Sequence, residues 1–249
     1  MRIAILSDVH SNIAALDAVL DDIARRGIHQ IVNLGDSLSG PFDAVATASR
    51  LMSLNIPTIS GNHDRALWDR PRAEMGLWEE WVVGELSSET FEWLRALPKT
   101  ISLDDVLLCH ATPSSDEENW LDYRGAQNRL VARDLGAVMD RLGDTDARVV
   151  CAGHTHTPRI VRLPAGQMIV NPGSVGCPAY LDTRSDPPFI HETGSPDARY
   201  AIIEDTQEGW TGDLVSVPYD SAPMAKLARA KGADSWAQAV ETGWITGEG

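Results

Sequence analysis

The sequence has few cysteines, few cationic side chains and no long apolar run. Its three cysteines are widely spaced and form no CxxC pair, which argues against a disulfide framework and favours a reducing compartment. No apolar run reaches about eighteen residues, the minimum for a membrane-spanning helix. The formal charge of −15 argues against general binding to nucleic acids or anionic membranes. We expect a cytoplasmic protein, because the first residues enter an apolar run and form no signal peptide.

The order of the apolar runs predicts an α/β protein. The segment RIAILSDVH is typical of a strand, and NIAALDAVLDDIARRG has apolar residues at helical spacing. Two further apolar runs, QIVNLGD and IPTISGNHD, flank a helical pattern at about 43–54, so the first part of the chain predicts βαβαβ with parallel strands. The length fits one domain over residues 1–249.

A tryptophan-rich segment at about 65–98 interrupts this pattern. It contains two amphipathic stretches, the second with Ser87 as its N-cap and Pro98 past its end, and it predicts a helical insert. We expect its tryptophans to pack against the sheet, in preference to forming a substrate lid. They are Trp68, Trp78, Trp81 and Trp93.

Short apolar runs dominate the rest of the chain. They predict strands at TISL, VLLCH, ARVVCAGHTH, RIVRL, QMIVNPGSVG, RYAIIED and GDLVSVPYD, with one helix from about Gly125 to Leu142. Residues 181–197 predict an exposed loop, and about thirty residues at the end of the chain predict helix. Strands joined by short turns predict a second sheet packed on the first, with helices outside both.

Five apolar runs end in strongly polar residues, which include five of the seven histidines. Parallel strands end at a common edge of the sheet, so these side chains are expected to converge there. A glycine precedes three of them, where it permits a sharp turn or a close approach. Alternate residues of an extended chain point the same way, so Asp8 and His10 are expected to face one side. The same argument applies to His154 and His156. The full set is Asp8, His10, Asp36, Asn62, His63, Asp64, His110, His154 and His156.

The chemistry of these side chains predicts a metal centre. They offer carboxylate oxygen, amide oxygen and imidazole nitrogen without a thiolate, a set that suits Mn²⁺, Fe²⁺ or Zn²⁺ better than it suits a structural zinc cage. The ligands exceed one tetrahedral site, and a bridging carboxylate would hold two ions about 3.5 to 4 Å apart, the spacing that clamps a phosphoryl group. Two such ions would give an acidic protein a local attraction for an anionic substrate.

In this order, the motifs Asp-x-His, Gly-Asp, Gly-Asn-His-Asp, His and Gly-His-x-His resemble those of the calcineurin-like metallophosphoesterases. The segments NPGSVG and VPYD resemble the small bacterial and archaeal phosphodiesterase branch. The resemblance implies a four-layer αββα sandwich of two mixed β-sheets flanked by helices, and a metal-bridging hydroxide as the nucleophile. It also implies the ligands, which are Asp8, His10 and His156 for one ion, Asn62, His110 and His154 for the other, and Asp36 as the bridge.

The resemblance implies further roles for the residues that follow Asn62. His63 would stabilise the transition state or protonate the leaving oxygen, and Asp64 would orient it. Asp36 is not followed by the Arg-Gly of phosphoprotein phosphatases, which argues against phosphoprotein substrates. Arg65 is a candidate for the missing anion contact.

The predicted activity is hydrolysis of small phosphodiesters, with nucleotides among the candidate substrates. The alternatives are a phosphomonoesterase, a nucleotide pyrophosphohydrolase, and a silent binding scaffold such as the retromer subunit that resembles this branch. The scaffold is disfavoured because every expected ligand and His63 are present. Mn²⁺ is the expected metal, with Fe, Ni and Zn as alternatives. A small phosphorylated substrate is the expected partner, and the branch also implies a homo-oligomer.

Other polar residues are expected to have structural roles. Asn12 is interpreted as an N-cap and Asn171 as a turn residue. His29 and His191 lie outside every motif and are assigned to the surface. The acidic run at 116–118 is assigned to a solvated loop.

Overall fold

Strands and helices occupy most of residues 1–245, the part of the chain that this computed structural model describes. The strands are β1 (Arg2–Leu6), β2 (Gln30–Asn33), β3 (Thr100–Leu103), β4 (Val106–Cys109), β5 (Asp122–Arg124), β6 (Leu130–Ala132), β7 (Val149–Cys151), β8 (Arg159–Arg162), β9 (Met168–Asn171), β10 (Ala179–Asp182), β11 (Phe189–Glu192), β12 (Ala198–Thr206) and β13 (Gly209–Val217). The α-helices are α1 (Ile13–Arg25), α2 (Ala44–Leu54), α3 (Asn62–Asp69), α4 (Leu77–Glu85), α5 (Ser88–Ala96), α6 (Leu135–Leu142), α7 (Ala222–Ala230) and α8 (Asp234–Thr242). Two short 3-10 helices are η1 (Arg72–Glu74) and η2 (Ala126–Asn128).

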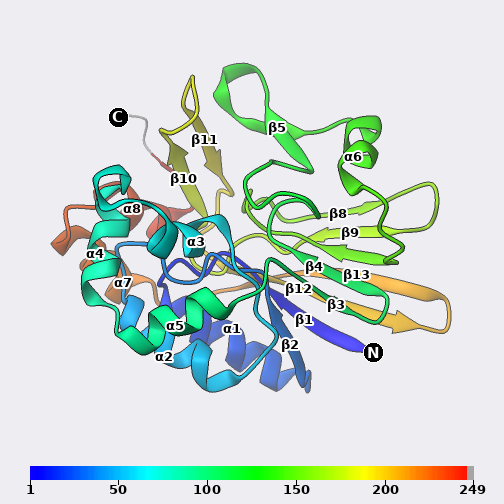
Figure 1. The fold of residues 1–249 in the computed structure, drawn as a ribbon, viewed down its shortest axis with the longest axis horizontal. Helices are drawn as coiled ribbons and strands as arrows, with labels where there is room; N and C mark the ends of the chain where they lie inside the picture. The colour runs from blue at the N-terminus through cyan, green and yellow to red at the C-terminus, as the bar shows by residue number, and fades with distance from the viewer. Residues whose placement is uncertain (246–249) are drawn as a thin grey trace.

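Two mixed sheets face each other at the centre of the molecule (Figure 1). The first has the strand order β13-β12-β1-β2, and the second has the order β3-β4-β7-β9-β8. β1 runs parallel to β2 and antiparallel to β12. In the second sheet, β4, β7 and β9 are parallel to one another. Their carboxyl ends, like those of β1 and β2, lead into the loops that carry the polar motifs.

Apolar side chains alternate between the two faces of each central strand. In β1, Ile3 and Ile5 pack between the sheets, while Ala4 and Leu6 pack under α1. In β7, Val150 faces α6 and its two neighbours face the first sheet. Because both faces are covered, these strands appear in the sequence as continuous apolar runs.

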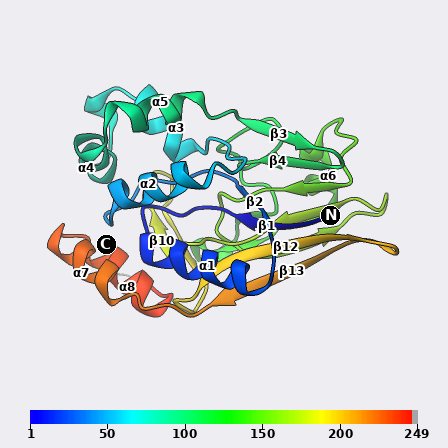
Figure 2. The same cartoon turned by 90° about the horizontal axis from the view of Figure 1, so that it is seen from below.

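Helices cover the outer faces of both sheets (Figure 2). Leu16 and Val19 of α1 pack on the first sheet, and Val138 and Leu142 of α6 pack on the second. These contacts confirm the predicted four-layer αββα arrangement. The predicted N-caps are confirmed as well, since the Asn12 side chain accepts a hydrogen bond from the N–H of Ala15 and Ser87 Oγ accepts one from the N–H of Thr90.

Three predicted segments differ from the structure. The strand expected at IPTIS is reduced to one isolated parallel bridge between Thr58 and Asn33 of β2. The helix expected from Gly125 to Leu142 begins at Leu135, because residues 122–132 form the small hairpin β5–β6 around η2. The loop expected at 181–197 contains most of the hairpin β10–β11. Both hairpins lie outside the two main sheets and lack the long apolar runs by which the central strands were found.

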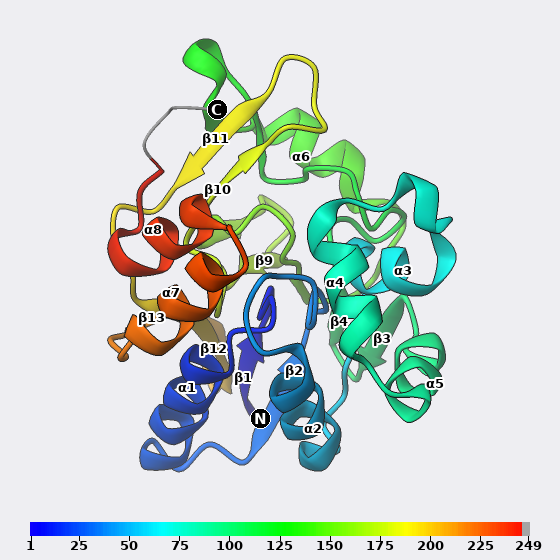
Figure 3. The ribbon, with the colours of Figure 1, turned by 90° about the vertical axis from the view of Figure 1, so that its left-hand side faces the viewer.

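Helices and a hairpin surround the loop edge of the sandwich (Figure 3). The expected insert is helical and contains most of α3 together with η1, α4 and α5. The expected C-terminal helices are α7 and α8; residues 246–249, also expected to be helical, lie outside the described residues. Across residues 1–245, the helices are all too short or too polar to cross a membrane.

Candidate metal centre and substrate pocket

The polar ends of the apolar runs converge at one edge of the sandwich. Two groups of side chains each bring their ligand atoms within 4.8 Å of one another. In the first group, His156 Nε2 lies 3.3 Å from Asp8 Oδ1 and 3.2 Å from His10 Nε2. The first group is Asp8, His10 and His156, and the second is Asp36, His110 and His154.

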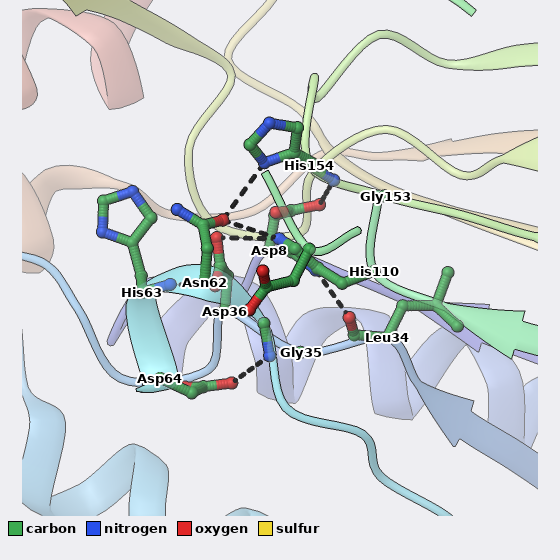
Figure 4. Close-up of polar contacts among 12 residues, drawn as sticks. Asp8, Leu34, Gly35, Asp36, Asn62, His63, Asp64, His110, Gly153 and His154 are labelled. Atoms are coloured by element: carbon green, nitrogen blue, oxygen red, sulfur yellow. Dashed lines mark hydrogen bonds and ion pairs between the residues drawn. The ribbon is translucent and has the colours of Figure 1, made fainter. Parts of the chain in front are cut away.

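Asn62, the first residue of α3, joins the second group (Figure 4). Its Oδ1 atom lies 3.1 Å from His110 Nε2 and 3.1 Å from His154 Nδ1. His110 Nε2 also lies 3.1 Å from Asp36 Oδ2. The structure therefore places all seven expected ligand residues in two adjoining clusters.

Each of the four clustered histidines directs one ring nitrogen to a backbone carbonyl. A ring N–H that donates to a carbonyl leaves the other nitrogen unprotonated, which is the form that binds metals. The outward bonds are His10 Nδ1 to Ser39 O at 2.6 Å, His110 Nδ1 to Leu34 O at 2.7 Å, His156 Nδ1 to Cys177 O at 2.8 Å, and His154 Nε2 to Glu117 O at 3.0 Å.

The inward atoms are acceptors that lack donors. Asp8 Oδ1 is buried and has no hydrogen-bond partner among the described residues. With its oxygen turned inward, Asn62 adds an acceptor where nitrogen atoms of His110 and His154 already meet. Rotating the amide would let its NH₂ donate to the same atoms, so the acceptors that meet there need either a hydrogen-bond donor or a cation. Carboxylate, amide oxygen and neutral imidazole fit divalent transition-metal ions.

The charges of the two clusters are strongly coupled. Burial works against ionisation of Asp8, but His156 outweighs it and lowers the pKa of Asp8 to about 2. Burial also disfavours a charged His110, yet Asp36 raises the pKa of His110 to about 9. Each carboxylate is therefore held ionised beside a positive partner, the position that a metal ion would take.

Ligand-bearing loops adopt an unusual backbone conformation. Asp8 and His10, and likewise His154 and His156, were expected to face one side because an extended backbone was assumed. The backbone at these residues is not extended, so that assumption is wrong. Five ligand residues have left-handed backbone angles, which cost roughly 1–3 kcal/mol each in non-glycine residues and are found at functional sites. Their φ values are 56° for Asp8, 47° for His10, 53° for Asp36, 68° for His154 and 56° for His156.

Backbone hydrogen bonds between loops hold this conformation. The N–H of Asp8 donates to Gly35 O and the N–H of His10 donates to Asp36 O, each at 3.0 Å. A Cβ on Gly61 would lie 2.6 Å from the backbone nitrogen of Asp36 and would also overlap its carboxylate. The expected need for a small residue before a ligand is confirmed here, because only glycine permits this approach.

Asp64 has a different role from the one expected. It was predicted to orient His63, but Asp64 Oδ1 accepts from the N–H of Ser37 at 2.8 Å and Oδ2 accepts from the N–H of Gly61 at 3.2 Å. Figure 4 shows the carboxylate pointing away from the His63 ring. Burial raises the pKa of Asp64 to about 7. Asp64 therefore connects two segments, the loop that contains Asp36 and the start of α3.

His63 instead faces two other side chains. Its Nδ1 atom lies 3.2 Å from Ser39 Oγ and 4.0 Å from an oxygen of Glu79. Burial lowers the pKa of His63. The backbone N–H of His63 donates a hydrogen bond to Asp36 Oδ1 at 2.8 Å, and this bond connects His63 to the metal cluster. A neutral ring beside a metal cluster can donate a hydrogen bond to substrate.

Arg65 does not take the anion-binding position that the sequence suggested. Its guanidinium donates to Asp116 at 2.7 and 3.2 Å and to Glu117 at 2.7 Å. The acidic run at 116–118 is thus not a remote loop, since the Glu117 carbonyl also accepts from His154. No sequence motif marks this loop, because a backbone carbonyl supplies the contact.

A pocket of about 710 Å³ opens above the two clusters. One side is the metal wall, defined as the seven expected ligand residues and the loops that carry them. Five of the seven line the pocket, namely His10, Asp36, Asn62, His154 and His156. The opposite side, here called the outer wall, comes from α3–α4, the β10–β11 hairpin and α8. The outer wall is defined as Arg70, Trp78, Glu79, Tyr180, Arg184 and Trp236.

Sequence reasoning found none of the outer wall as a functional site. Trp78 was expected to pack on the sheet, but it lines the pocket. His191 was assigned to the surface, but it is buried beside Tyr180, with ring centres 5.2 Å apart. These residues belong to no short motif, so only their shared position in space identifies them. Asn171 has the predicted turn role, since its Oδ1 accepts from the N–H of Gly173.

Comparisons with known proteins agree with this geometry. Residues 1–187 match the calcineurin-like phosphoesterase superfamily domain. The chain is 29% identical over 238 residues to an uncharacterized protein of Methanocaldococcus jannaschii, with 88% of each chain covered. The structure resembles a metallophosphoesterase from Sphaerobacter thermophilus with a TM-score of 0.74 and 26% identity, over 98% of this chain and 100% of that one. A hypothetical protein from Pyrococcus horikoshii OT3 gives a TM-score of 0.76 at 15% identity, over 98% and 99% of the two chains.

The fold and the paired metal-type clusters define a metallophosphoesterase. This chain belongs to the calcineurin-like phosphoesterase superfamily.

Proposed function

We propose that this protein is a phosphodiesterase that hydrolyses small phosphodiesters, nucleotides among them, with two divalent transition-metal ions, of which Mn²⁺ is favoured. The observation that carries the proposal is the convergence of seven oxygen and nitrogen ligands at the base of a pocket with His63 on its rim. Asp8, His10 and His156 would hold one ion, Asn62, His110 and His154 the other, and Asp36 would bridge. When bound, two such ions would supply Lewis acidity toward the phosphoryl group and lower the pKa of a bound water molecule.

The chain's own residues bind the substrate and move the proton. The water oxygen forms a bond to phosphorus, and the bond from phosphorus to the leaving oxygen breaks. The neutral His63 ring can take up, through solvent, the proton that the attacking water loses, and the resulting imidazolium can donate it to the leaving oxygen. The hydrogen bond from the backbone N–H of His63 to Asp36 fixes the position of His63 relative to the metal cluster.

The pocket supports a small substrate. Its volume of about 710 Å³ lies within the range of about 300–1,000 Å³ that is usual for small-molecule sites. Trp78, Tyr180 and Trp236 line it and offer flat surfaces for an aromatic base or an aryl group.

Hydrolysis of paired aryl substrates tests this proposal. Metal-stripped protein receives Mn²⁺, Ni²⁺, Zn²⁺ or Mg²⁺, and release of para-nitrophenol is followed from the bis-ester and from the mono-ester of phosphate. We expect metal-dependent turnover, faster on the bis-ester. His63→Ala should lower kcat by about 10²-fold or more, the usual contribution of a proton donor, with metal content unchanged.

Other outcomes have defined meanings. Faster hydrolysis of the mono-ester would replace the proposal with a phosphomonoesterase. Protein that binds two ions but hydrolyses neither ester would support a binding scaffold. Wild-type turnover in His63→Ala would contradict the proposed role of this histidine.

A further inference from the structure

Three basic side chains meet at one buried carboxylate in the outer wall. Glu79 is only 2% exposed, although it lies at the edge of the pocket. Its Oε1 atom lies 3.3 Å from Arg70 Nη1 and 4.0 Å from His63 Nδ1, and it also accepts from Arg184 Nη2. Burial works to raise the pKa of Glu79, but Arg184 outweighs it and the pKa is lowered. Glu79 is therefore an ionised anchor for two arginines.

The two arginines have more hydrogen-bonding capacity than Glu79 uses. A guanidinium carries five N–H donors, and Glu79 is the only side-chain partner recorded for either group within residues 1–245. Arg184 remains 48% exposed and Arg70 26% exposed, and both line the pocket. Two cations against one carboxylate leave one unit of positive charge in this cluster, while Asp182, which also lines the pocket, accepts hydrogen bonds from the backbone N–H of Arg184 and from Ser185.

The surrounding structure fixes this arrangement. Arg184 lies in the β10–β11 turn, where Asp182 accepts from its backbone N–H at 2.8 Å and from the Ser185 hydroxyl at 2.7 Å. A Cβ at Gly76, before α4, would lie 2.6 Å from Glu79 Oε2 and 3.4 Å from Arg184 Nη2. Gly76 thus leaves room for the insert and the hairpin to share one ion pair, so that Arg184 reaches the pocket from a distant part of the chain.

We propose that Arg184 and Arg70, held by Glu79, form a second anion subsite that binds a phosphate group of the substrate other than the one cleaved at the metal centre. The inference rests on the proposed phosphodiesterase function and specifies its substrate class. That class is a nucleotide phosphodiester with an additional phosphate, whose base can lie against the aromatic residues of the pocket. Arginine suits this role, because its planar donors match two oxygens of one phosphate.

The charge balance distinguishes this role from a purely structural one. A structural link between insert and hairpin needs one arginine for one carboxylate, and Arg184 alone would provide it. Arg70, which follows α3, approaches the same Glu79 oxygen as His63 and adds a second cation beside the reaction centre. A second phosphate bound there would be close to the cleaved bond, as in a nucleotide that carries both phosphates on one sugar.

Two chromogenic nucleotides test the subsite. One is the para-nitrophenyl ester of thymidine 5′-phosphate, and the other is the same ester with a second phosphate on the 3′ hydroxyl. Release of para-nitrophenol reports cleavage of the same bond in both. With Mn²⁺-loaded wild-type protein we expect kcat/KM to be about 10-fold or more higher for the bisphosphate, mainly through a lower KM, the gain of one charge-assisted contact.

Substitutions of Arg184 test whether the subsite causes the preference for the bisphosphate nucleotide. Arg184→Gln should reduce the ratio of the two kcat/KM values to within about threefold of one, and Arg184→Lys should restore part of it because the charge remains. Arg72→Gln is the matched control, since Arg72 is exposed in η1 of the same insert and does not line the pocket. It should keep the wild-type ratio. Thermal unfolding of each variant checks that it is folded.

The outcomes separate the two proposals. If wild-type protein cleaves both nucleotides with equal kcat/KM, the subsite is contradicted and the phosphodiesterase function stands; this result needs no variant. A preference that survives Arg184→Gln also contradicts the subsite. If neither nucleotide nor the bis-aryl ester is cleaved with any metal, the phosphodiesterase function itself fails.

Discussion

The metal wall and the outer wall of the pocket are built in different ways. The metal wall consists of short loops that directly follow buried parallel strands, and hydrogen bonds between loop backbones hold left-handed residues in place. The outer wall consists of side chains from an inserted helix, a hairpin and a C-terminal helix, and the ion pairs of Glu79 join the insert to the hairpin.

This difference separates chemistry from selectivity. Loops anchored by two sheets keep ligand atoms fixed, as a metal centre requires, because a shift of a fraction of an ångström changes metal binding. The outer-wall elements belong to neither main sheet, and the arginines and Glu79 of this wall contact no metal ligand, so these residues can change without altering the backbone that holds the ligands. We infer that the metal wall determines the reaction and that the outer wall determines the substrate. The predictions below test that division, from the largest expected effect to the smallest.

Removal of Asp36, the carboxylate that we propose bridges the two ions, should have the largest effect. In Asp36→Asn, loss of one negative charge between the two clusters should weaken metal binding and lower kcat/KM on the bis-aryl ester by roughly 10³-fold or more. Metal content by atomic emission and steady-state kinetics measure this. Asp105→Asn, an exposed carboxylate far from the pocket, is the control and should keep full activity. Full activity in Asp36→Asn would show that the metal wall does not determine the reaction.

Metal removal should also affect stability. An ion that binds only the folded protein stabilises it by about 2.7 kcal/mol when its free concentration is 100 times Kd. For a protein of this size that corresponds to a rise in Tm of roughly 5–10 °C. Thermal unfolding with Mn²⁺ or with a chelator measures the difference. It should be preserved in Arg184→Gln and reduced in Asp36→Asn; equal loss in both would mean that the two walls are not independent.

The metal wall could be predicted from the sequence because each ligand adjoins a strand that is buried on both faces. The run before His154, for example, ends at Cys151 inside the core. The position of Asp36 follows in the same way from β2. The pairing of His154 with Asn62, however, was implied only by resemblance, because the left-handed backbone separates His154 from His156 in a way that strand geometry does not predict.

The outer wall could not be predicted, because its residues meet only through tertiary packing. Arg184 lies in a turn rich in Asp, Pro and Ser, a composition that indicates an exposed loop and gives no sign of Glu79 more than a hundred residues earlier. Arg65 was chosen for its place next to a motif, yet acidic residues of another loop neutralise it. Adjacency in sequence thus identified ligands on strand ends but failed for side chains on helices and turns.

Close packing of glycine against the metal wall gives the next prediction. Gly61→Ala should destabilise the protein by about 1–3 kcal/mol, because its Cβ would overlap Asp36. Gly84→Ala is the matched control, since Gly84 lies in helix α4 with no atom within 4 Å of its added Cβ. It should stabilise the protein by about 0.5–1 kcal/mol. Urea unfolding measures both, and equal effects would contradict the rigid metal wall.

The smallest effect is expected for Arg65→Gln, which tests whether the loop at 116–118 is held by charge. Arg65 pairs with Asp116, whose side chain is 20% exposed, so the loss of unfolding free energy should be about 1 kcal/mol, and the more exposed Glu117 should add little.

This stability difference should depend on pH. Burial works to raise the pKa of Asp116, but the hydrogen bond from Arg65 outweighs it and lowers the pKa below 3.8. A carboxyl group with a lowered folded-state pKa contributes stability at pH above its unfolded value and loses it as the pH falls through its folded value. The difference between wild type and Arg65→Gln in urea unfolding should therefore be full at pH 7 and shrink below about pH 4.

The same variant should keep the wild-type preference for the bisphosphate nucleotide, because the Arg65 guanidinium donates to the loop and not to the pocket. Loss of that preference would return Arg65 to the anion-binding role that the sequence suggested.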